Sequence, residues 1–266
     1  GCQIQEMRYE AQLAFKQKMV QNNLERIGGL SDFEMYPVIG METPYAYRNK
    51  AQFPVGEDKD GNIVIGFYAG RTHHIVEQTD CCIGAPENGE VLRKVKAYMQ
   101  KNQIRPYNEE HHSGIVRHIL IRTGYHTKEI MVCLIVNAAK ASCLKNAEQL
   151  TESLREMDGM TSVMVNFNTE KTNVILGKKS EVLWGQPYIE DFIGDVKYQI
   201  SPQSFFQVNP MQTEKLYAKA LEYAGLTGKE KVIDAYCGTG TIGLIAASQA
   251  KEVIGVELNR DAVKDA

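Results

Sequence analysis

The feature that most constrains the fold is the segment Lys231–Leu258, KVIDAYCGTGTIGLIAASQAKEVIGVEL, in which two apolar runs flank a glycine-rich turn. The short apolar runs predict buried strands, and the longer one between them predicts a helix. In chain order the parts are strand, glycine turn, helix, strand and acid, at 231–236, 237–240, 241–249, 252–256 and Glu257. This order is typical of half of a nucleotide-binding βαβ unit.

The glycines of this turn fit a bound nucleotide. Glycine allows the backbone to approach a ligand closely, and the following helix begins with free N–H groups. Gly238, Gly240 and Gly243 give the pattern GxGxxG, and Glu257 follows Asp234 by 23 residues, close to the roughly 20 of a dinucleotide fingerprint. The sequence pattern D-x-x-C-G-x-G resembles the first motif of S-adenosylmethionine (SAM) methyltransferases. A SAM site is favoured, with an NAD site or a plain strand–helix turn as alternatives.

Length and composition are those of an ordinary globular protein. The chain has 266 residues, 43% hydrophobic and 24% charged, with a net charge of −3. No apolar run approaches the roughly 18 residues of a membrane helix, and no signal-peptide pattern opens the chain, so a cytoplasmic location is expected. Both ends look cut, because the chain opens on Gly-Cys and closes inside a helix start.

The rest of the chain alternates helix-period and strand-period segments. We expect helices at Tyr9–Ile27, Glu90–Gln103, Ala147–Met157 and Pro210–Ala224. Extended segments are expected at 43–53, 115–123, 129–137 and 161–168, and a hairpin turn at 58–61 is expected between strands at 50–55 and 62–68. The segments 179–191 and 195–200 would close this region around a turn at Gly194-Asp195. A domain boundary is expected at Lys197–Asn209, just before a helix.

Several stretches together resemble one enzyme family. SPQSFFQVNPMQTEKLY (201–217), VIDAYCGTGTIGL (232–244) and VIGVE (253–257) are similar to segments of the bacterial RNA uracil-5 methyltransferases, in the same order. The N-terminal stretch GCQIQEMRYEAQLAFKQKMVQNNLERIGG is similar to the segment after the cysteine cluster of the iron–sulfur-containing 23S rRNA branch. The resemblance covers essentially the whole chain.

The resemblance implies an α/β protein: a central α+β domain followed by the first βαβ part of a Rossmann-like SAM methyltransferase domain. Residues 1–40 would form an iron–sulfur-proximal segment and helix, 41–196 the central domain, and 197–266 the truncated methyltransferase domain. It also implies methylation of C5 of a uridine in 23S rRNA. In that family a cysteine thiolate adds to C6 of the uracil, and the resulting enolate-like C5 takes the methyl group.

No cysteine here matches the family's nucleophile. That residue lies in an S-C-N-P-like motif, which does not occur in this sequence, so the nucleophile and the general base are expected beyond Ala266 and the chain is expected to be inactive alone. Cys237 belongs to the cofactor turn and is not assigned this role. Cys133 and Cys143 are expected to be core residues.

Two cysteines match ligands of a [4Fe-4S] cluster in the iron–sulfur branch. Cys2 matches the third ligand and Cys81, 79 residues later, the fourth. Cys82 is adjacent and is the alternative to Cys81. Two thiolates cannot hold a cluster, whose iron atoms take four cysteine ligands. This chain alone is therefore expected to lack it.

The cofactor contacts that the resemblance implies fall mainly on the glycine turn. Glu257 would hold the ribose, and Asp234, Gly238 and Gly240 would shape the turn near the methionine moiety. Gln207 would contact SAM from the strand-to-helix junction upstream. Tyr236 would lie beside the cofactor, and Thr241 is a weaker candidate at the helix start; a core aromatic is an equal alternative for Tyr236.

Other residues are candidates for contact with RNA. Phe205 would stack near a flipped uracil, although one of Phe205 and Phe206 is expected in the core. Arg48, Lys50 and Arg71, interleaved with Tyr45 and Tyr47, are candidates for the RNA backbone. The pairs His73-His74 and His111-His112 lack carboxylates at metal spacing and are interpreted as surface residues.

The sequence leaves three other functions open. The tRNA-directed relatives share the chemistry but lack the iron–sulfur cysteines. An NAD-binding oxidoreductase module would need only the glycines and Glu257. A non-catalytic RNA-binding protein is a further possibility.

Overall fold

A computed structural model describes residues 2–258, 260 and 263 of the chain. It divides into two compact units, Gly1–Tyr45 and Ala46–Ala266. None of the helices described is both long and apolar enough to cross a membrane.

The first unit is a helix with the following chain folded back along it. Helix α1 (Tyr9–Asn22) continues as a π-helical turn, Asn23–Ile27, so the predicted helix Tyr9–Ile27 is confirmed with a widened last turn. The Tyr9 hydroxyl accepts a hydrogen bond of 2.6 Å from the Met41 amide, and the Gln17 side chain accepts one of 3.2 Å from the Val38 amide. These bonds hold the returning segment against the helix.

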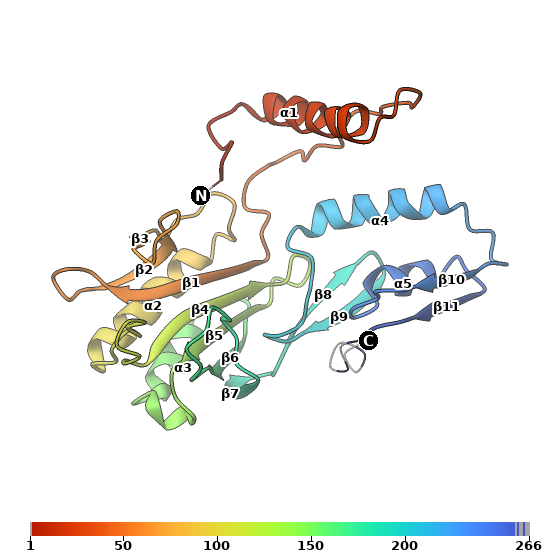
Figure 1. Ribbon diagram of the computed structural model, residues 1–266. Helices are drawn as coiled ribbons and strands as arrows, with labels where there is room; N and C mark the ends of the chain where they lie inside the picture. The colour runs from red at the N-terminus through yellow and green to blue at the C-terminus, as the bar shows by residue number, and fades with distance from the viewer. Residues whose placement is uncertain (1, 259, 261–262, 264–266) are drawn as a thin grey trace. The chain divides into compact units, whose positions relative to one another are not determined.

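A seven-stranded sheet organises the second unit (Figure 1), in the order β3-β2-β1-β4-β5-β6-β7. Its strands are β1 (Lys50–Glu57), β2 (Ile63–Tyr68), β3 (Ile75–Glu77), β4 (Val116–Thr123), β5 (Ile130–Val136), β6 (Met160–Phe167) and β7 (Lys179–Gly185). All neighbours are antiparallel except β5 and β6. That parallel pair is joined through helix α3 (Ala147–Arg155), the crossover that parallel pairing requires.

Strand β5 is buried on both faces, which explains its continuous apolar sequence. Ile130, Val132, Leu134 and Val136 pack into one core with α3 and helix α2 (Asn88–Lys101). The alternate side chains, Met131, Cys133 and Ile135, pack into a second core on the opposite face. The alternation follows from the two-residue repeat of a strand.

The second core joins the sheet to the C-terminal part of the chain. Beside Leu120 of β4, Met164 of β6 and Phe206, its members come from the hairpin β8 (Ile189–Ile193) and β9 (Val196–Ile200), and from helix α4 (Pro210–Ala224). The predicted bounds of α4 are confirmed. Asn209 caps the helix by accepting a hydrogen bond from the Gln212 amide, Pro210 occupies its first turn, and Gly225 ends it in a left-handed conformation.

The last elements are strand β10 (Lys231–Asp234), helix α5 (Thr241–Ala246) and strand β11 (Glu252–Gly255). β10 and β11 pair in parallel. The predicted strand–turn–helix–strand order is confirmed, and each element is shorter than its apolar run. The fold therefore has the predicted class, a mixed α/β structure ending in a βαβ unit.

Two predicted extended segments are wrong in their bounds. The segment 43–53 becomes a strand only at Lys50. The segment 179–191 splits into β7 and β8, which belong to different sheets. Gly185 has a left-handed φ of 80° and Pro187 has no amide to donate, so the strand cannot continue through them.

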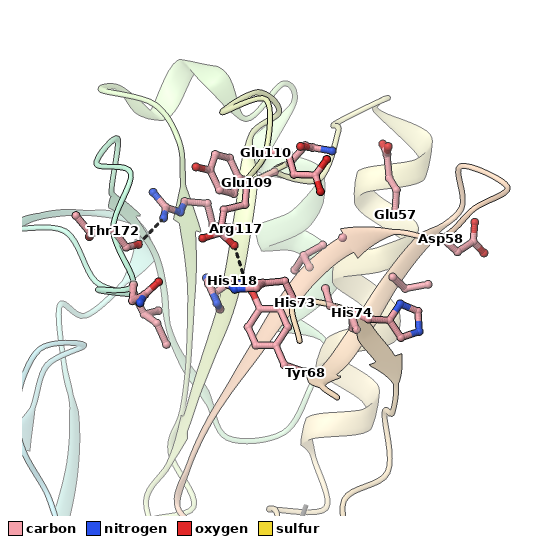
Figure 2. A pocket seen from close by; sticks show the side chains of 18 of the residues that line it. Glu57, Asp58, Tyr68, His73, His74, Glu109, Glu110, Arg117, His118 and Thr172 are labelled. Carbon is pink, nitrogen blue, oxygen red and sulfur yellow. Dashed lines mark hydrogen bonds and ion pairs between the residues drawn. The ribbon is translucent and has the colours of Figure 1, made fainter. Parts of the chain in front are cut away.

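A cavity of about 560 Å³ opens between β1, β2, β4 and two loops (Figure 2). It shares no lining residue with the glycine turn.

Candidate cofactor site

The glycine turn lies where the two parallel strands end. Asp234 is paired with Gly255, and its carbonyl accepts a hydrogen bond of 2.8 Å from the Val256 amide. The Cys237 amide donates a hydrogen bond of 3.1 Å to the Val256 carbonyl. The turn is thus fastened at both sides to the chain that leads into Glu257.

Two glycines shape the turn. Gly238 and Gly240 have φ of 55° and 76°, a left-handed conformation that glycine adopts without strain. The Gly238 amide donates a hydrogen bond of 2.9 Å to Oε2 of Glu257. The predicted turn residues Gly238 and Gly240 and the predicted ribose ligand Glu257 therefore belong to one local structure.

Asp234 lies behind the turn, half-buried against helix α5. Its Oδ2 is buried and has no hydrogen-bond partner among the described residues. A buried polar atom without a partner is uncommon in a native structure, and a donor supplied by a ligand would satisfy it. Tyr236, two residues after Asp234 and directly before the turn, is 93% exposed. Its alternative interpretation as a core aromatic is wrong.

Cys237, at the start of the turn, and Thr241, directly after it, have structural roles. The Thr241 hydroxyl is 3.1 Å from the Tyr217 hydroxyl of α4, and its carbonyl accepts a bond of 3.1 Å from the Tyr198 hydroxyl of β9. Cys237 packs on Gly255, where an added Cβ would lie 2.9 Å from its sulfur. Thr241 thus anchors α5, and Cys237 packs the turn against β11.

The segment 201–209 carries the other two predicted contacts. Phe206 is buried in the second core against Tyr198, with ring centroids 5.7 Å apart, whereas Phe205 is 72% exposed. One member of the pair is therefore core, as predicted. The Gln207 carbonyl accepts a bond of 2.9 Å from the Asn49 side chain, which fixes the backbone that carries Gln207.

A buried arginine that the sequence analysis missed holds the same segment. Arg122 is 2% exposed and donates to the carbonyls of Pro202 (3.3 Å) and Ser204. Burial lowers its pKa to about 10. A charged residue directly after the apolar run Ile119–Ile121, inside a predicted strand, was the available signal, since a buried charge requires partners.

Arg122 pairs in register with Lys50 of β1. Burial, followed by the charges of Arg122 and Arg48, lowers the pKa of Lys50 to about 8. Two of the predicted RNA-contact residues, Arg48 and Lys50, are therefore half-buried in a cationic cluster, whereas Arg71 is exposed.

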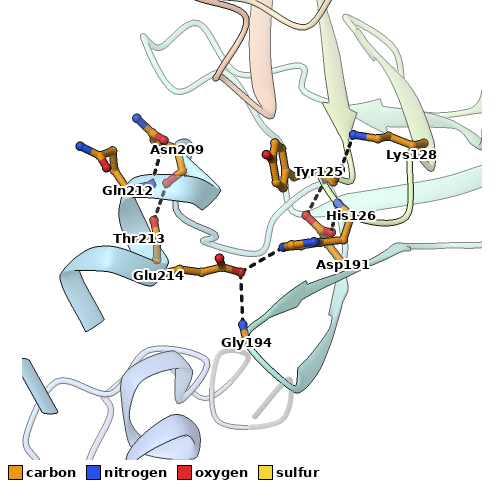
Figure 3. A network of polar contacts seen from close by, with 9 residues as sticks. All are labelled: Tyr125, His126, Lys128, Asp191, Gly194, Asn209, Gln212, Thr213 and Glu214. Atoms are coloured by element: carbon orange, nitrogen blue, oxygen red, sulfur yellow. Dashed lines mark hydrogen bonds and ion pairs between the residues drawn. The ribbon is translucent and has the colours of Figure 1, made fainter. Parts of the chain in front are cut away.

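A polar network connects α4 to the sheet (Figure 3). The carboxylate of Asp191, 0% exposed, accepts hydrogen bonds from the amides of Tyr125 (2.8 Å) and His126 (2.9 Å) in the β4–β5 turn. His126 Nε2 is 3.0 Å from Oε1 of Glu214 on α4, which also accepts a bond of 3.2 Å from the Gly194 amide. These contacts position α4, which packs against α5 through Thr241.

The cysteines predicted as cluster ligands do not form a metal site in the part of the chain that is described. Cys2, in the first unit, is exposed; Cys81, in the second, is half-buried, and Cys82 is exposed. No group of three or more His, Cys, Asp or Glu side chains able to hold a metal ion occurs among the described residues. These residues alone do not fit a [4Fe-4S] cluster.

The histidine pairs lie at the surface. His73 Nδ1 is 2.7 Å from Oε2 of Glu109, and the Tyr107 hydroxyl is 2.8 Å from His112 Nδ1. His74 and His111 are exposed. The Glu109 partner, 36 residues from His73, was not visible in the local sequence.

The fold and the turn together define the class of protein. A central α/β sheet is followed in the chain by a Rossmann-like βαβ unit of the SAM methyltransferase type. The chain is similar over its full length to proteins named uncharacterized RNA methyltransferases. It is 49% identical to one from Halalkalibacterium halodurans over 267 aligned residues and 47% identical to one from Clostridium tetani. The chain spans about 57% of the length of these two relatives.

A solved structure has the same fold. It is the Pyrococcus abyssi tRNA (uracil-54, C5)-methyltransferase in complex with S-adenosyl-L-homocysteine. The match has a TM-score of 0.81 at 28% sequence identity and covers 100% of this chain and 60% of that one. No family model matches the chain.

Proposed function

We propose that this chain carries the methyl-donor half of an RNA uracil-5 methyltransferase. The observation that carries the proposal is the glycine turn closed by the Gly238–Glu257 hydrogen bond of 2.9 Å, in a fold that matches a uracil-5 methyltransferase over the whole chain. Bound there, SAM would supply an electrophilic methyl group. A cytoplasmic location belongs to the same proposal.

The residues of the turn fit this ligand. Glu257 is a carboxylate that would accept hydrogen bonds from ribose hydroxyls, and the buried Oδ2 of Asp234 would accept from a ligand donor. The ring of Tyr236 is exposed and could pack against an aromatic face of the ligand. Gln207 would approach from the segment that Arg122 and Asn49 hold. Because its hydroxyl contacts Tyr217, we assign Thr241 a structural role and no direct contact with SAM.

The target of the proposed reaction is C5 of a uridine in 23S rRNA. Phe205, 72% exposed, would stack on the extruded base. Arg48, Lys50 and Arg71, with Tyr45 and Tyr47, would contact the RNA backbone. The Pyrococcus relative acts on tRNA, so tRNA is the second candidate.

We place the nucleophile outside residues 1–266. A thiolate must add to C6 before C5 can attack a methyl group, and it leaves again when the C5 proton is removed. Burial raises the pKa of Cys133 to about 12 and also raises that of Cys143. Cys237 is packed on Gly255. We therefore expect no 5-methyluridine from this chain alone; its formation would contradict the placement.

The test of the RNA class uses a longer protein that contains this chain. Transcripts of 23S rRNA and of tRNA are incubated with SAM, and 5-methyluridine is measured by mass spectrometry of the digested RNA. We expect 5-methyluridine in the 23S transcript. Product in the tRNA alone would move the assignment to tRNA, and no product in either would overturn the proposed reaction.

We propose that Cys2 and Cys81 ligate a [4Fe-4S] cluster in the longer protein, with Cys82 as the alternative to Cys81. The support is the spacing of the cysteines and their at least partial exposure. Anaerobic reconstitution with iron and sulfide should give visible absorbance that Cys81→Ser abolishes and Cys82→Ser retains. Absence of visible absorbance in the reconstituted longer protein would contradict the proposal of a cluster.

A further inference from the structure

The 560 Å³ cavity on the sheet is lined by side chains of several strands and loops (Figure 2). Its apolar floor comes from Val64 of β2 and Ile75 of β3, and Val174 and Ile175 close one side. A volume of this size is within the range of small-molecule sites, roughly 300–1,000 Å³.

Arg117 fixes two walls of the cavity. It is 5% exposed and donates to the carbonyls of Asn168 (2.8 Å), Glu170 (2.7 Å) and Thr172 (3.4 Å), which orders the 168–175 loop. Its guanidinium also lies 4.4 Å from the ring centre of Tyr107, which belongs to the hairpin on the other side. Both walls are therefore preorganised.

Aromatic side chains line the cavity beside this floor. Tyr68 is 42% exposed, and its ring is edge-on to His118 at 6.4 Å and to His73 at 5.7 Å between centroids. Nδ1 of His118 and Nε of Arg117 are buried and have no hydrogen-bond partner among the described residues. Burial lowers the pKa of His118 to about 4, so its ring is neutral at pH 7.

The charges of the lining disfavour an anion. Glu57, Asp58, Glu109 and Glu110 outnumber the one permanent cation, Arg117, whose terminal nitrogens are already bonded to carbonyls. Carboxylates accept hydrogen bonds from amino groups. The occupant should therefore be planar, so that it can stack on Tyr68. It should also carry amino groups that can donate hydrogen bonds to Glu109 and Glu110.

We propose that this cavity binds an unpaired RNA base with an exocyclic amino group, near the uridine that is methylated. The inference rests on the proposed function. Uracil, which has no amino group, is the base that this lining would bind least well.

The register of the sheet relates this cavity to the cationic cluster. Lys50 pairs with Arg122 and Pro54 pairs with His118, so the two pairs are four residues apart along β1 and β4. Four residues of a strand span about 13 Å. His118 and Arg122 lie on the same face as Leu120, a member of the second core. The cavity and the cationic cluster therefore lie on one face of the sheet, on either side of the buried Leu120.

The test titrates the full chain, with its Ile and Val methyl groups labelled with carbon-13, with adenosine, cytidine or uridine. We expect adenosine and cytidine to shift the methyl resonances of Ile75 and Val174, and uridine to bind at least fivefold more weakly. Tyr68→Leu should weaken adenosine binding about tenfold through lost stacking. Glu109→Gln should reduce the preference for cytidine over uridine. Tyr223→Leu on α4 and Glu152→Gln on α3, both exposed, are the controls.

Three outcomes would overturn the inference. They are the absence of methyl shifts with any nucleoside, equal binding of uridine, and shifts caused by inorganic phosphate or by an arginine-rich peptide in place of nucleosides. SAM binding by wild type and Tyr68→Leu is measured in parallel by calorimetry. SAM binding without nucleoside binding would refute the base site and leave the methyl-donor site standing.

Discussion

At the residue scale, Glu257 has two roles in this account. In the structure its carboxylate accepts a hydrogen bond from the Gly238 amide, and in the proposed complex it accepts from the ribose of SAM. Glu257→Gln keeps the side-chain shape and removes the charge. Because a hydrogen bond to a charged group contributes about 1.5–3 kcal/mol, we expect SAM to bind at least tenfold more weakly by calorimetry.

The control for Glu257 lies on the strand that leads to it. Glu252, at the start of β11, forms a surface ion pair of 2.6 Å with Lys231. Surface pairs contribute little, so Glu252→Gln should leave SAM affinity unchanged. Equal affinities for wild type and both variants would remove Glu257 from the site.

Lys50 gives a pH-dependent prediction at the same scale. Its pKa falls from 10.5 to about 8 in the folded chain, first through burial and then through Arg122 and Arg48. Between these values the unfolded chain binds the extra proton, so stability rises with pH. Lys50→Met should stabilise the chain at pH 7 by on the order of 1 kcal/mol after solvent screening, and this gain should disappear as pH rises from 8 towards 10.5.

Urea unfolding at several pH values measures this difference. Lys178→Met, at an exposed lysine of the same chain, is the control and should show no such pH dependence. A Lys50→Met effect that is constant from pH 7 to 10 would contradict the altered pKa.

At the element scale, the glycine turn can be tested against a second turn of the same geometry. Gly238 and Gly225 have φ of 55° and 58°, and an added Cβ at either meets no atom within 4 Å. Alanine should cost about 1–2 kcal/mol of backbone strain at both positions. Only Gly238→Ala should weaken SAM binding, because Gly225 merely ends α4. Equal SAM affinities of the two variants would show that the ligand does not approach Gly238.

The hairpin β8–β9 depends on one buried carboxylate. Asp191→Ala removes the acceptor of the Tyr125 and His126 amides, and unsatisfied buried donors cost about 1–3 kcal/mol each. We expect urea unfolding to show a loss of about 2–4 kcal/mol, with a smaller loss for Asp191→Asn. Asp195→Asn, exposed in the adjoining turn, should be neutral; a neutral Asp191→Ala would contradict the anchoring role.

At the scale of the whole molecule, the elements could be predicted where local sequence determines them. The continuous apolar run of β5 and the cap, proline and glycine of α4 are local signals, and both elements have the predicted position. The glycine turn follows in the same way from Gly238 and Gly240. The split between β7 and β8 lies at Gly185 and Pro187, inside a segment whose strand-like pattern continues on both sides of it.

Contacts between distant segments could not be predicted. Asp191 bonds amides 66 and 65 residues away, and Arg122 bonds carbonyls 80 and 82 residues away. The cavity combines β1–β4 with the 107–110 hairpin and the 172–175 loop. A single sequence contains no pairing information of this kind, so the positions of Gln207 and Phe205 relative to the sheet emerge only from the structure.

Calorimetric titration of the chain with SAM and, separately, with NAD tests whether the glycine turn is a methyl-donor site. We expect saturable binding of one SAM per chain, weakened in Glu257→Gln, and no heat of binding with NAD. Binding of NAD in preference to SAM would show that the turn serves a dinucleotide, and binding of neither would contradict the claim that this chain holds the methyl donor.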